Sequence, residues 1–191
     1  DTPEFKAWFG ESKVTDAEGK PLRVYHGTSD DFDSFNLDHK NRKDTGWLGT
    51  GVYLTTSQDI ASSYANLKPG YAGENVMALY AKVENPYYAT IKDKQRLQLI
   101  SNRSLAEGRE AADAWTAELK AKGHDGVILR FNESEVGNAN ASEEIVVFSP
   151  SAVKSATGNS GKFDTNDPSI LAQKQGTKPR GEIQFLKDEG T

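Results

Sequence analysis

An alternating apolar segment ends in Tyr25-His26-Gly27-Thr28, a group of residues that could contact a ligand. Leu22 and Val24 share one face of the expected strand, and His26 falls on that face at its carboxyl end. The glycine that follows has no Cβ, so a ligand could approach closely enough to use its backbone N–H and C=O. A lone histidine is more often a structural residue, and on these residues alone that alternative stays open.

Two tyrosines and two carboxylates are the other candidates. Tyr53 lies in the segment GVYLT, and Tyr64 follows on the apolar face of the next expected helix. Two such rings could flank a flat ligand ring, but core packing of both rings is the alternative that periodicity favours. Glu143 and Glu144 open the apolar segment 145–148. Carboxylates at the entrance of a strand are usually solvated, so this pair alone predicts no chemistry.

The composition limits the classes of protein that this chain can belong to. Over 191 residues the formal net charge is −5, which disfavours a broad basic face for nucleic acid. The absence of cysteine excludes disulfides, zinc–thiolate sites and a cysteine nucleophile. No apolar segment reaches the roughly 18 residues that span a bilayer, and no signal peptide is evident. The sequence predicts a soluble protein with no metal site, no membrane partner and no targeting signal in this chain.

Periodicity and capping residues predict the elements that position these side chains. Thr2 is a typical N-cap for a helix over 3–9, and Ser57 for the helix after the second strand. Pro86 is expected to end a strand, and Gly123 to end a helix. The expected strands cover 21–26, 52–55, 75–83, 125–130 and 143–148, and the remaining expected helices cover 57–67, 92–103 and 107–122.

The order of these elements predicts the fold class and the domain organisation. Strands neighbour strands more often than a regular βαβ alternation allows, so the class is α+β. Residues 1–158 are predicted to form one domain. Periodicity is lost after Pro150, and residues 159–191 are predicted to be a C-terminal tail or linker. The long polar segment 28–46 is expected to be a surface loop with a functional role.

The order and spacing of the motifs resemble the ADP-ribosyltransferase superfamily. His-Gly-Thr ends a strand, Gly-Val-Tyr-Leu-Thr precedes Tyr64, and Glu144 stands before Ile-Val-Val-Phe. This pattern is similar to the His-Tyr-Glu branch, which includes the poly(ADP-ribose) polymerases and diphtheria-like toxins. Four segments are most similar to ADP-ribosyltransferase domains of phage and mobile-element polyvalent proteins. Their sequences are TPEFKAWFGESKV, GKPLRVYHGT, GWLGTGVYLT and EEIVVFSPSAVKSATGN.

The resemblance implies a fold and a set of site residues. The fold would have two packed, mainly antiparallel sheets in a split β-sandwich, with flanking helices and a cleft for NAD as co-substrate. Glu144 would stabilise an oxocarbenium-like state and orient the ribose 2′-hydroxyl, and His26 would bind a ribose hydroxyl of the adenosine half. In this resemblance Gly27 would contact the nicotinamide carboxamide, and the two tyrosines would enclose the nicotinamide ring. The implied catalytic residues are Glu144, His26 and Tyr53. The implied NAD-binding residues are His26, Gly27, Thr28, Tyr53 and Tyr64.

Two single positions and one basic cluster bear on what the resemblance implies. Some relatives carry a serine three residues before the second tyrosine, where this chain has Ala61. The residue two before Glu144 is Ser142 rather than glutamate, so selectivity for arginine acceptors is not predicted. The basic cluster in the 28–46 loop, Lys40, Arg42 and Lys43, lies where the family has a donor loop, and contact with the NAD pyrophosphate is one interpretation.

The predicted function is NAD-dependent mono-ADP-ribosyl transfer to a macromolecular acceptor, with release of nicotinamide. A host protein is expected as the acceptor rather than a nucleic acid, because the chain is acidic. The domain is expected to be a toxin or phage-effector part of a larger polypeptide, acting in the cytoplasm or after delivery into a host cell. The alternatives are an NAD glycohydrolase and a catalytically silent module that binds ligands in an NAD-like pocket.

Overall fold

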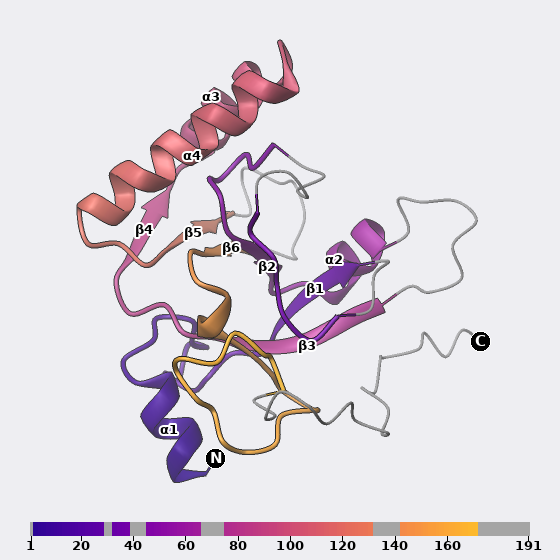
Figure 1. Ribbon diagram of the computed structural model, residues 1–191, viewed down its shortest axis with the longest axis vertical. Helices are drawn as coiled ribbons and strands as arrows, with labels where there is room; N and C mark the ends of the chain where they lie inside the picture. Colours follow the sequence, from indigo (N-terminus) through magenta and orange to yellow (C-terminus); the bar gives the residue numbers. More distant parts are fainter. Residues whose placement is uncertain (1, 29–31, 39–44, 66–74, 132–141, 172–191) are drawn as a thin grey trace.

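The computed structural model describes residues 2–28, 32–38, 45–65, 75–131 and 142–171. In this part the chain folds around a seven-stranded sheet with strand order β4-β5-β6-β2-β1-β3-β7 (Figure 1). The α+β class predicted from the sequence is confirmed. The strands are β1 Val24–Thr28, β2 Val52–Thr55, β3 Asn75–Ala81, β4 Pro86–Ala89, β5 Gly126–Arg130, β6 Glu143–Val147 and β7 Val153–Ser155, and the helices are α1 Pro3–Phe9, α2 Gln58–Ala65, α3 Ile91–Ser101 and α4 Leu105–Ala121, with a short 3-10 helix at Pro150–Ala152.

The pairing within the sheet is weakest between β1 and β2. Strand β1 pairs with β3 at five consecutive positions, and β2 pairs with β6 at four. Between β1 and β2 the register holds a single pair, Tyr25 with Thr55. The described strands therefore form one hydrogen-bonded sheet rather than the two packed sheets expected from the sequence, with a seam between the β4-β5-β6-β2 half and the β1-β3-β7 half.

The two strands at the sheet edges differ from the sequence prediction. Pro86 was expected to end a strand, but it is the first residue of β4, which pairs in parallel with β5. Proline has no N–H to donate, and an edge strand tolerates it at its first position. Strand β7 lies after Pro150, where periodicity is lost, and it spans only three residues on the other edge. Such a short strand leaves no alternation to detect.

The helix boundaries follow from capping residues. The Thr2 hydroxyl accepts a hydrogen bond of 3.2 Å from the Phe5 N–H, as predicted for the start of α1. The Ser57 hydroxyl accepts one of 3.3 Å from the Ile60 N–H at the start of α2. Helix α4 is followed by Gly123 with φ of 88°, a left-handed conformation that suits glycine. In Figure 1, α3 and α4 lie side by side beyond the β4–β5 edge, and α2 lies beside β1.

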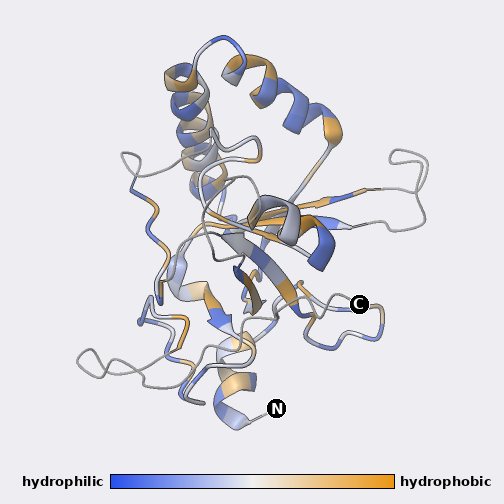
Figure 2. Ribbon diagram, turned by 90° about the vertical axis from the view of Figure 1, so that its right-hand side faces the viewer, coloured by the Kyte–Doolittle hydropathy of each residue, from blue (hydrophilic) through white to orange (hydrophobic). Residues whose placement is uncertain are grey.

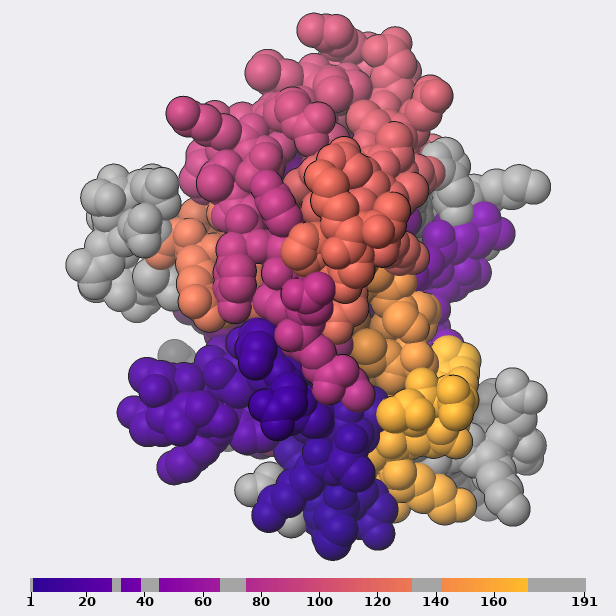
Figure 3. All heavy atoms as spheres, turned by 90° about the vertical axis from the view of Figure 1, so that its left-hand side faces the viewer, coloured from indigo at the N-terminus to yellow at the C-terminus, as the bar shows by residue number. Residues whose placement is uncertain are grey.

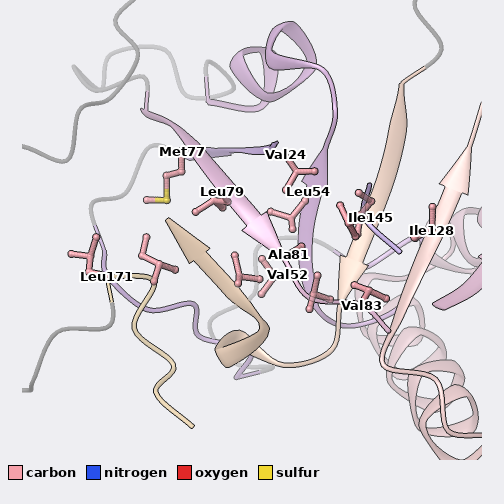
Figure 4. Close-up of a cluster of buried hydrophobic side chains, with 14 residues drawn as sticks. Val24, Val52, Leu54, Met77, Leu79, Ala81, Val83, Ile128, Ile145 and Leu171 are labelled. Carbon is pink, nitrogen blue, oxygen red and sulfur yellow. The ribbon is translucent and has the colours of Figure 1, made fainter. Parts of the chain in front are cut away.

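The core is divided between two clusters because neighbouring residues of a strand face opposite sides of the sheet. In β6, Ile145 and Val147 belong to the first cluster and Val146 to the second. The first cluster includes Val24, Leu54 and residues of β3, and Figure 4 shows these side chains pointing toward one another. The second cluster lies under α3 and α4. In Figure 2 the strands of the sheet and the helices α3 and α4 all carry both hydrophobic and hydrophilic residues.

Residues 158–171 continue to pack on the sheet beyond β7. Ile170 and Leu171 belong to the first core cluster and are 1% and 3% exposed. The Ser155 N–H donates to the Ile170 carbonyl at 2.8 Å, and the Ile170 N–H donates to the Asp33 carbonyl at 2.7 Å. Figure 3 shows the segment that ends at Leu171, in yellow, beside the N-terminal segment in indigo. The predicted boundary at residue 158 stays a prediction, and residues 172–191 of the predicted tail lie outside the described residues.

Two side chains, Lys154 and Phe163, hold the segment 158–171 against the rest of the structure. Lys154 is fully buried, and its Nζ donates to the backbone carbonyls of Asp167 and Ser169. Phe163 closes a third apolar cluster on α1, with its ring centroid 5.1 Å from that of Phe5.

Across the described residues, no helix is long and apolar enough to cross a membrane.

Candidate functional site

The seam between β1 and β2 brings two of the predicted site residues together. A continued antiparallel ladder from the Tyr25–Thr55 pair would set Gly27 opposite Tyr53, but no such pair forms. Instead the His26 ring nitrogen Nδ1 lies 2.8 Å from the Tyr53 carbonyl oxygen. Because a carbonyl can only accept, the imidazole must carry a hydrogen on Nδ1 and donate it. His26 therefore joins the two halves of the sheet where their backbones separate.

Two phenylalanines that sequence reasoning missed pack against the His26 ring. The Phe35 ring meets it edge-on with centroids 4.9 Å apart, and the Phe32 ring lies at 6.2 Å. Both come from the polar segment 28–46, where two aromatic residues among aspartates and asparagines are the only signal. These edge-to-face contacts restrict the ring to one orientation.

Gly27 is required for a different reason from the one inferred from the sequence. A Cβ on this residue would lie 1.7 Å from the Ala61 carbonyl oxygen of α2 and 2.7 Å from its carbon. Helix α2 therefore rests directly on the backbone of β1, and Ala61 itself is 1% exposed. From the sequence, the missing Cβ of Gly27 is expected to leave room for a ligand. In the structure, helix α2 occupies the space where that Cβ would lie.

The Tyr53 hydroxyl is fixed at both its donor and its acceptor positions. It accepts from the Leu48 N–H at 2.8 Å and donates to the Gly49 carbonyl at 2.7 Å. The ring packs against the second core cluster. Since both partners belong to the 45–51 loop, the position of the Tyr53 ring depends on how that loop is held.

Helices α3 and α4 hold the 45–51 loop. The Thr50 N–H donates to the Thr116 hydroxyl at 2.7 Å, and the Thr50 hydroxyl donates to the Asp113 carboxylate. The Trp47 indole N–H donates to the Ser101 hydroxyl at 2.9 Å. The loop is thus attached to both helices, and Tyr53 is positioned through it.

Glu144 and Tyr53 share one face of neighbouring strands. Glu144 pairs with Thr55, and Tyr53 with Val146, so the two side chains are diagonal neighbours. Such neighbours are about 7–8 Å apart on one face of a sheet. The Glu144 side chain is 17% exposed, and its Oε2 lies 2.6 Å from Nζ of Lys94 in α3. The structure brings a half-buried carboxylate to the same face as the Tyr53 ring.

The neighbouring carboxylate belongs to the other face. Glu143 Oε1 lies 2.6 Å from Nε of Arg130, whose guanidinium lies over the Tyr88 ring. Glu143 is therefore separated from Glu144 by the thickness of the sheet, because neighbouring residues of a strand face opposite sides. Ser142, which precedes both carboxylates, is 8% exposed.

Tyr64 and Thr28 are the remaining predicted NAD-binding residues. Tyr64 is 53% exposed on α2, so the alternative that it is a core aromatic is wrong. Among the ring contacts of the described residues, none joins Tyr64 to Tyr53, and their enclosure of a ligand ring stays a prediction. Thr28 ends β1 opposite Asn75. The basic cluster Lys40, Arg42 and Lys43 lies outside the described residues. In the described part of the chain, no three His, Asp or Glu side chains are grouped as metal ligands would be.

The comparison with protein families identifies the family of this chain. The family described as ADP-ribosyltransferase in polyvalent proteins matches residues 16–163, which contain His26, Tyr53, Tyr64 and Glu144. This chain belongs to that family. The resemblance to ADP-ribosyltransferases of polyvalent proteins inferred from the sequence is confirmed, and ADP-ribosyl transfer is the chemistry that this membership supports. No curated protein and no solved structure matches the chain.

Proposed function

We propose that this chain transfers ADP-ribose from NAD to a macromolecular acceptor and releases nicotinamide, with the site at the seam between β1 and β2. One observation carries the proposal most directly. The seam sets His26 against the backbone of Tyr53, and Tyr53 and Glu144 share one face of adjacent strands. Residues of the three types that the resemblance requires thus come from three separate strands, and the His26 ring is bonded to the backbone of the residue that carries the proposed stacking ring.

Cleavage of the nicotinamide–ribose bond of NAD requires few catalytic groups from the protein. Nicotinamide is attached as a cationic pyridinium and departs as a neutral molecule, so no general acid is needed, unlike ordinary glycoside hydrolysis. The bond that breaks joins the nicotinamide nitrogen to C1′ of the ribose, and the leaving nitrogen takes the bonding electron pair. The ribose becomes oxocarbenium-like, and a carboxylate held nearby stabilises its positive charge.

The residues present fit this requirement. Glu144 is a carboxylate with 17% of its side chain exposed, where an electrostatic contact is less screened than in water. In the proposal it contacts the ribose, and His26 binds a ribose hydroxyl of the adenosine half. Tyr53 and Tyr64 enclose the nicotinamide ring, and a desolvated cation–π contact of this kind contributes about 2 kcal/mol. In the proposal Gly27 and Thr28 contact NAD from β1, and the seam is where the two halves of a split β-sandwich would part.

The acceptor and the setting belong to the same proposal. A protein acceptor is favoured over a nucleic acid, because the chain carries a net charge of −5. Transfer of a single ADP-ribose unit is proposed, within a toxin or phage-effector domain of a larger polypeptide that acts in the cytoplasm or in a host cell. When water replaces the acceptor, the same step gives NAD hydrolysis.

The test is nicotinamide release from NAD by the purified chain and its Glu144→Gln variant. Glutamine keeps the size of the side chain but removes the negative charge, so we expect the rate to fall about 100- to 1,000-fold while NAD affinity measured by calorimetry changes little. Glu143→Gln is the matched control, because Glu143 pairs with Arg130 on the opposite face. Equal rates for Glu144→Gln and the parent chain would contradict the proposed site.

The acceptor is tested separately. The chain is incubated with labelled NAD and host-cell lysate, and labelled macromolecules are separated on a gel and identified by mass spectrometry. Labelled protein with single ADP-ribose units supports the proposal, and a ladder of products would contradict transfer of one unit. Nicotinamide release without labelled macromolecules would assign the chain to NAD hydrolysis.

A further inference from the structure

We propose that Lys94 is a positioning residue for Glu144, an inference that rests on the proposed function. Lys94 lies in the first turns of α3, and its Nζ lies 2.6 Å from Glu144 Oε2. The two residues are 50 positions apart in the chain. No motif of the sequence pairs them, and the contact exists only because α3 packs over the face of the sheet that carries Glu144.

The ion pair is shielded and short. The side chains of Lys94 and Glu144 are 20% and 17% exposed. At such burial, a direct hydrogen bond between an ammonium and a carboxylate is less screened than at the surface. In the described part of the chain, the Glu144 carboxylate makes no other hydrogen bond. The ammonium thus fixes Oε2 and leaves Oε1 as the oxygen that a ribose hydroxyl can meet.

The ammonium is itself held in place. It lies 5.4 Å from the centroid of the Phe131 ring, a cation–π contact at the end of β5. The start of α3 is closed by a capping box in which the Thr90 N–H donates to the Asp93 carboxylate at 2.8 Å. One turn after Lys94, Leu97 is 1% exposed in the second core cluster. Lys94 therefore projects from a helix that is fixed at its start and along its packed face.

The same pair of helices serves Tyr53. Ser101 of α3 and Thr116 of α4 hold the 45–51 loop, whose backbone binds the Tyr53 hydroxyl. The α3–α4 pair therefore sets both the ring on β2 and the carboxylate on β6. A carboxylate left without Lys94 would rotate about its side-chain torsions, and a misplacement of about 1 Å at a reacting centre can lower a rate about 100-fold.

The experiment compares Lys94→Met and Lys94→Arg with the parent chain in nicotinamide release from NAD. Methionine keeps the length and the apolar stem but removes the charge, so we expect kcat to fall about 10-fold, with KM for NAD changed less than about 2-fold. Arginine can still donate to the carboxylate, so Lys94→Arg should recover most of kcat. Lys92→Met, an exposed lysine on the same helix, is the control.

A double-mutant cycle shows whether Lys94 acts through Glu144. In the Glu144→Gln background, Lys94→Met should change kcat by less than about 2-fold, since the carboxylate that it orients is gone. Equal effects of Lys94→Met in both backgrounds would overturn the inference. An increase of kcat in Lys94→Met would overturn it as well, because the ion pair would then be an inhibitory contact.

The failure of this inference is distinguishable from that of the proposed function. If Glu144→Gln has no effect, the site itself is wrong. If Glu144→Gln lowers the rate but Lys94→Met matches Lys92→Met, the site holds and only the positioning role fails. Thermal unfolding of each variant is measured alongside, and a kcat loss that follows a loss of folded protein would contradict the positioning role.

Discussion

At the scale of single residues, Tyr53 depends on its hydroxyl as much as on its ring. The hydroxyl bridges the Leu48 N–H and the Gly49 carbonyl, and Leu48 is fully buried. A buried N–H that loses its partner retains the cost of its removal from water. The hydroxyl therefore closes the 45–51 loop onto β2, in addition to the contact with NAD that we propose for the ring.

Tyr53→Phe should accordingly lower the free energy of unfolding by about 1–3 kcal/mol, because the Leu48 N–H becomes unsatisfied. The measurement is urea denaturation followed by intrinsic fluorescence. Tyr88→Phe is the matched control, since Tyr88 is 51% exposed on β4 and its hydroxyl makes no hydrogen bond within the described residues. A loss of the same size in both variants would show that the bridge contributes nothing specific.

The sequence indicated some of the site residues and not others, for a physical reason. His26 and Glu144 are polar residues at the ends of apolar strand segments, a pattern visible locally. Lys94 is one of several basic residues on a polar helix, and Phe35 lies in an irregular loop. Their importance arises only from tertiary contacts with Glu144 and His26, which local periodicity does not encode.

At the scale of elements, the contact between α2 and β1 sets where Tyr64 can be. Gly27 lies under the Ala61 carbonyl so closely that a methyl group in its place would overlap the helix backbone. Backbone on both sides means that no side-chain rotation can relieve the overlap. The helix that carries Tyr64 is therefore placed by a residue without a side chain.

Gly27→Ala should move α2 away from β1 and lower the free energy of unfolding by about 1–3 kcal/mol. Nicotinamide release should fall as well, because Tyr64 moves with the helix. Gly158→Ala is the comparison, since its Cβ would meet side-chain atoms rather than backbone, those of Leu171 at 3.0 Å and Ser155 at 3.4 Å. Unfolding in urea and NAD turnover are measured for both variants, and a Gly27→Ala protein as stable and active as Gly158→Ala would refute this account.

Most of the elements could be predicted because their signals are local. The Thr2 cap, the amphipathic pattern of α4 and the apolar segments of the central strands lie within short windows of sequence. Strands β4 and β7 could not be predicted, because each forms by pairing with a distant strand at a sheet edge. The seam escaped prediction for the same reason, since it concerns where two strands stop pairing.

At the scale of the whole molecule, the buried Lys154 links the sheet to the segment that follows it. Its ammonium donates to the carbonyls of Asp167 and Ser169, and this segment in turn binds the Asp33 carbonyl next to Phe32. Burial lowers the pKa of Lys154 below its usual value, partly opposed by the charges of Asp167 and Asp164. The packing around His26 is thus connected to a lysine on the far edge of the sheet.

This lowered pKa predicts a pH dependence of stability. The unfolded chain binds the Lys154 proton more tightly than the folded chain, so the contribution of Lys154 to stability rises with pH toward the usual lysine pKa of about 10.4. Lys154→Met lacks this dependence. The difference in unfolding free energy between the parent chain and Lys154→Met should therefore grow in favour of the parent as pH rises. Lys92→Met is measured as the control for the loss of one lysine charge, and a curve for Lys154→Met parallel to that of the parent would contradict the prediction.

The burial of Ile170 and Leu171 also determines where this chain can be shortened. The match to the family ends at residue 163, but the buried contacts continue to residue 171. A chain cut after residue 163 would keep His26, Tyr53 and Glu144 but lose two side chains of the first core cluster. Residues 164–171 therefore belong with the matched segment in any shortened form of this chain that is meant to keep its first core cluster intact.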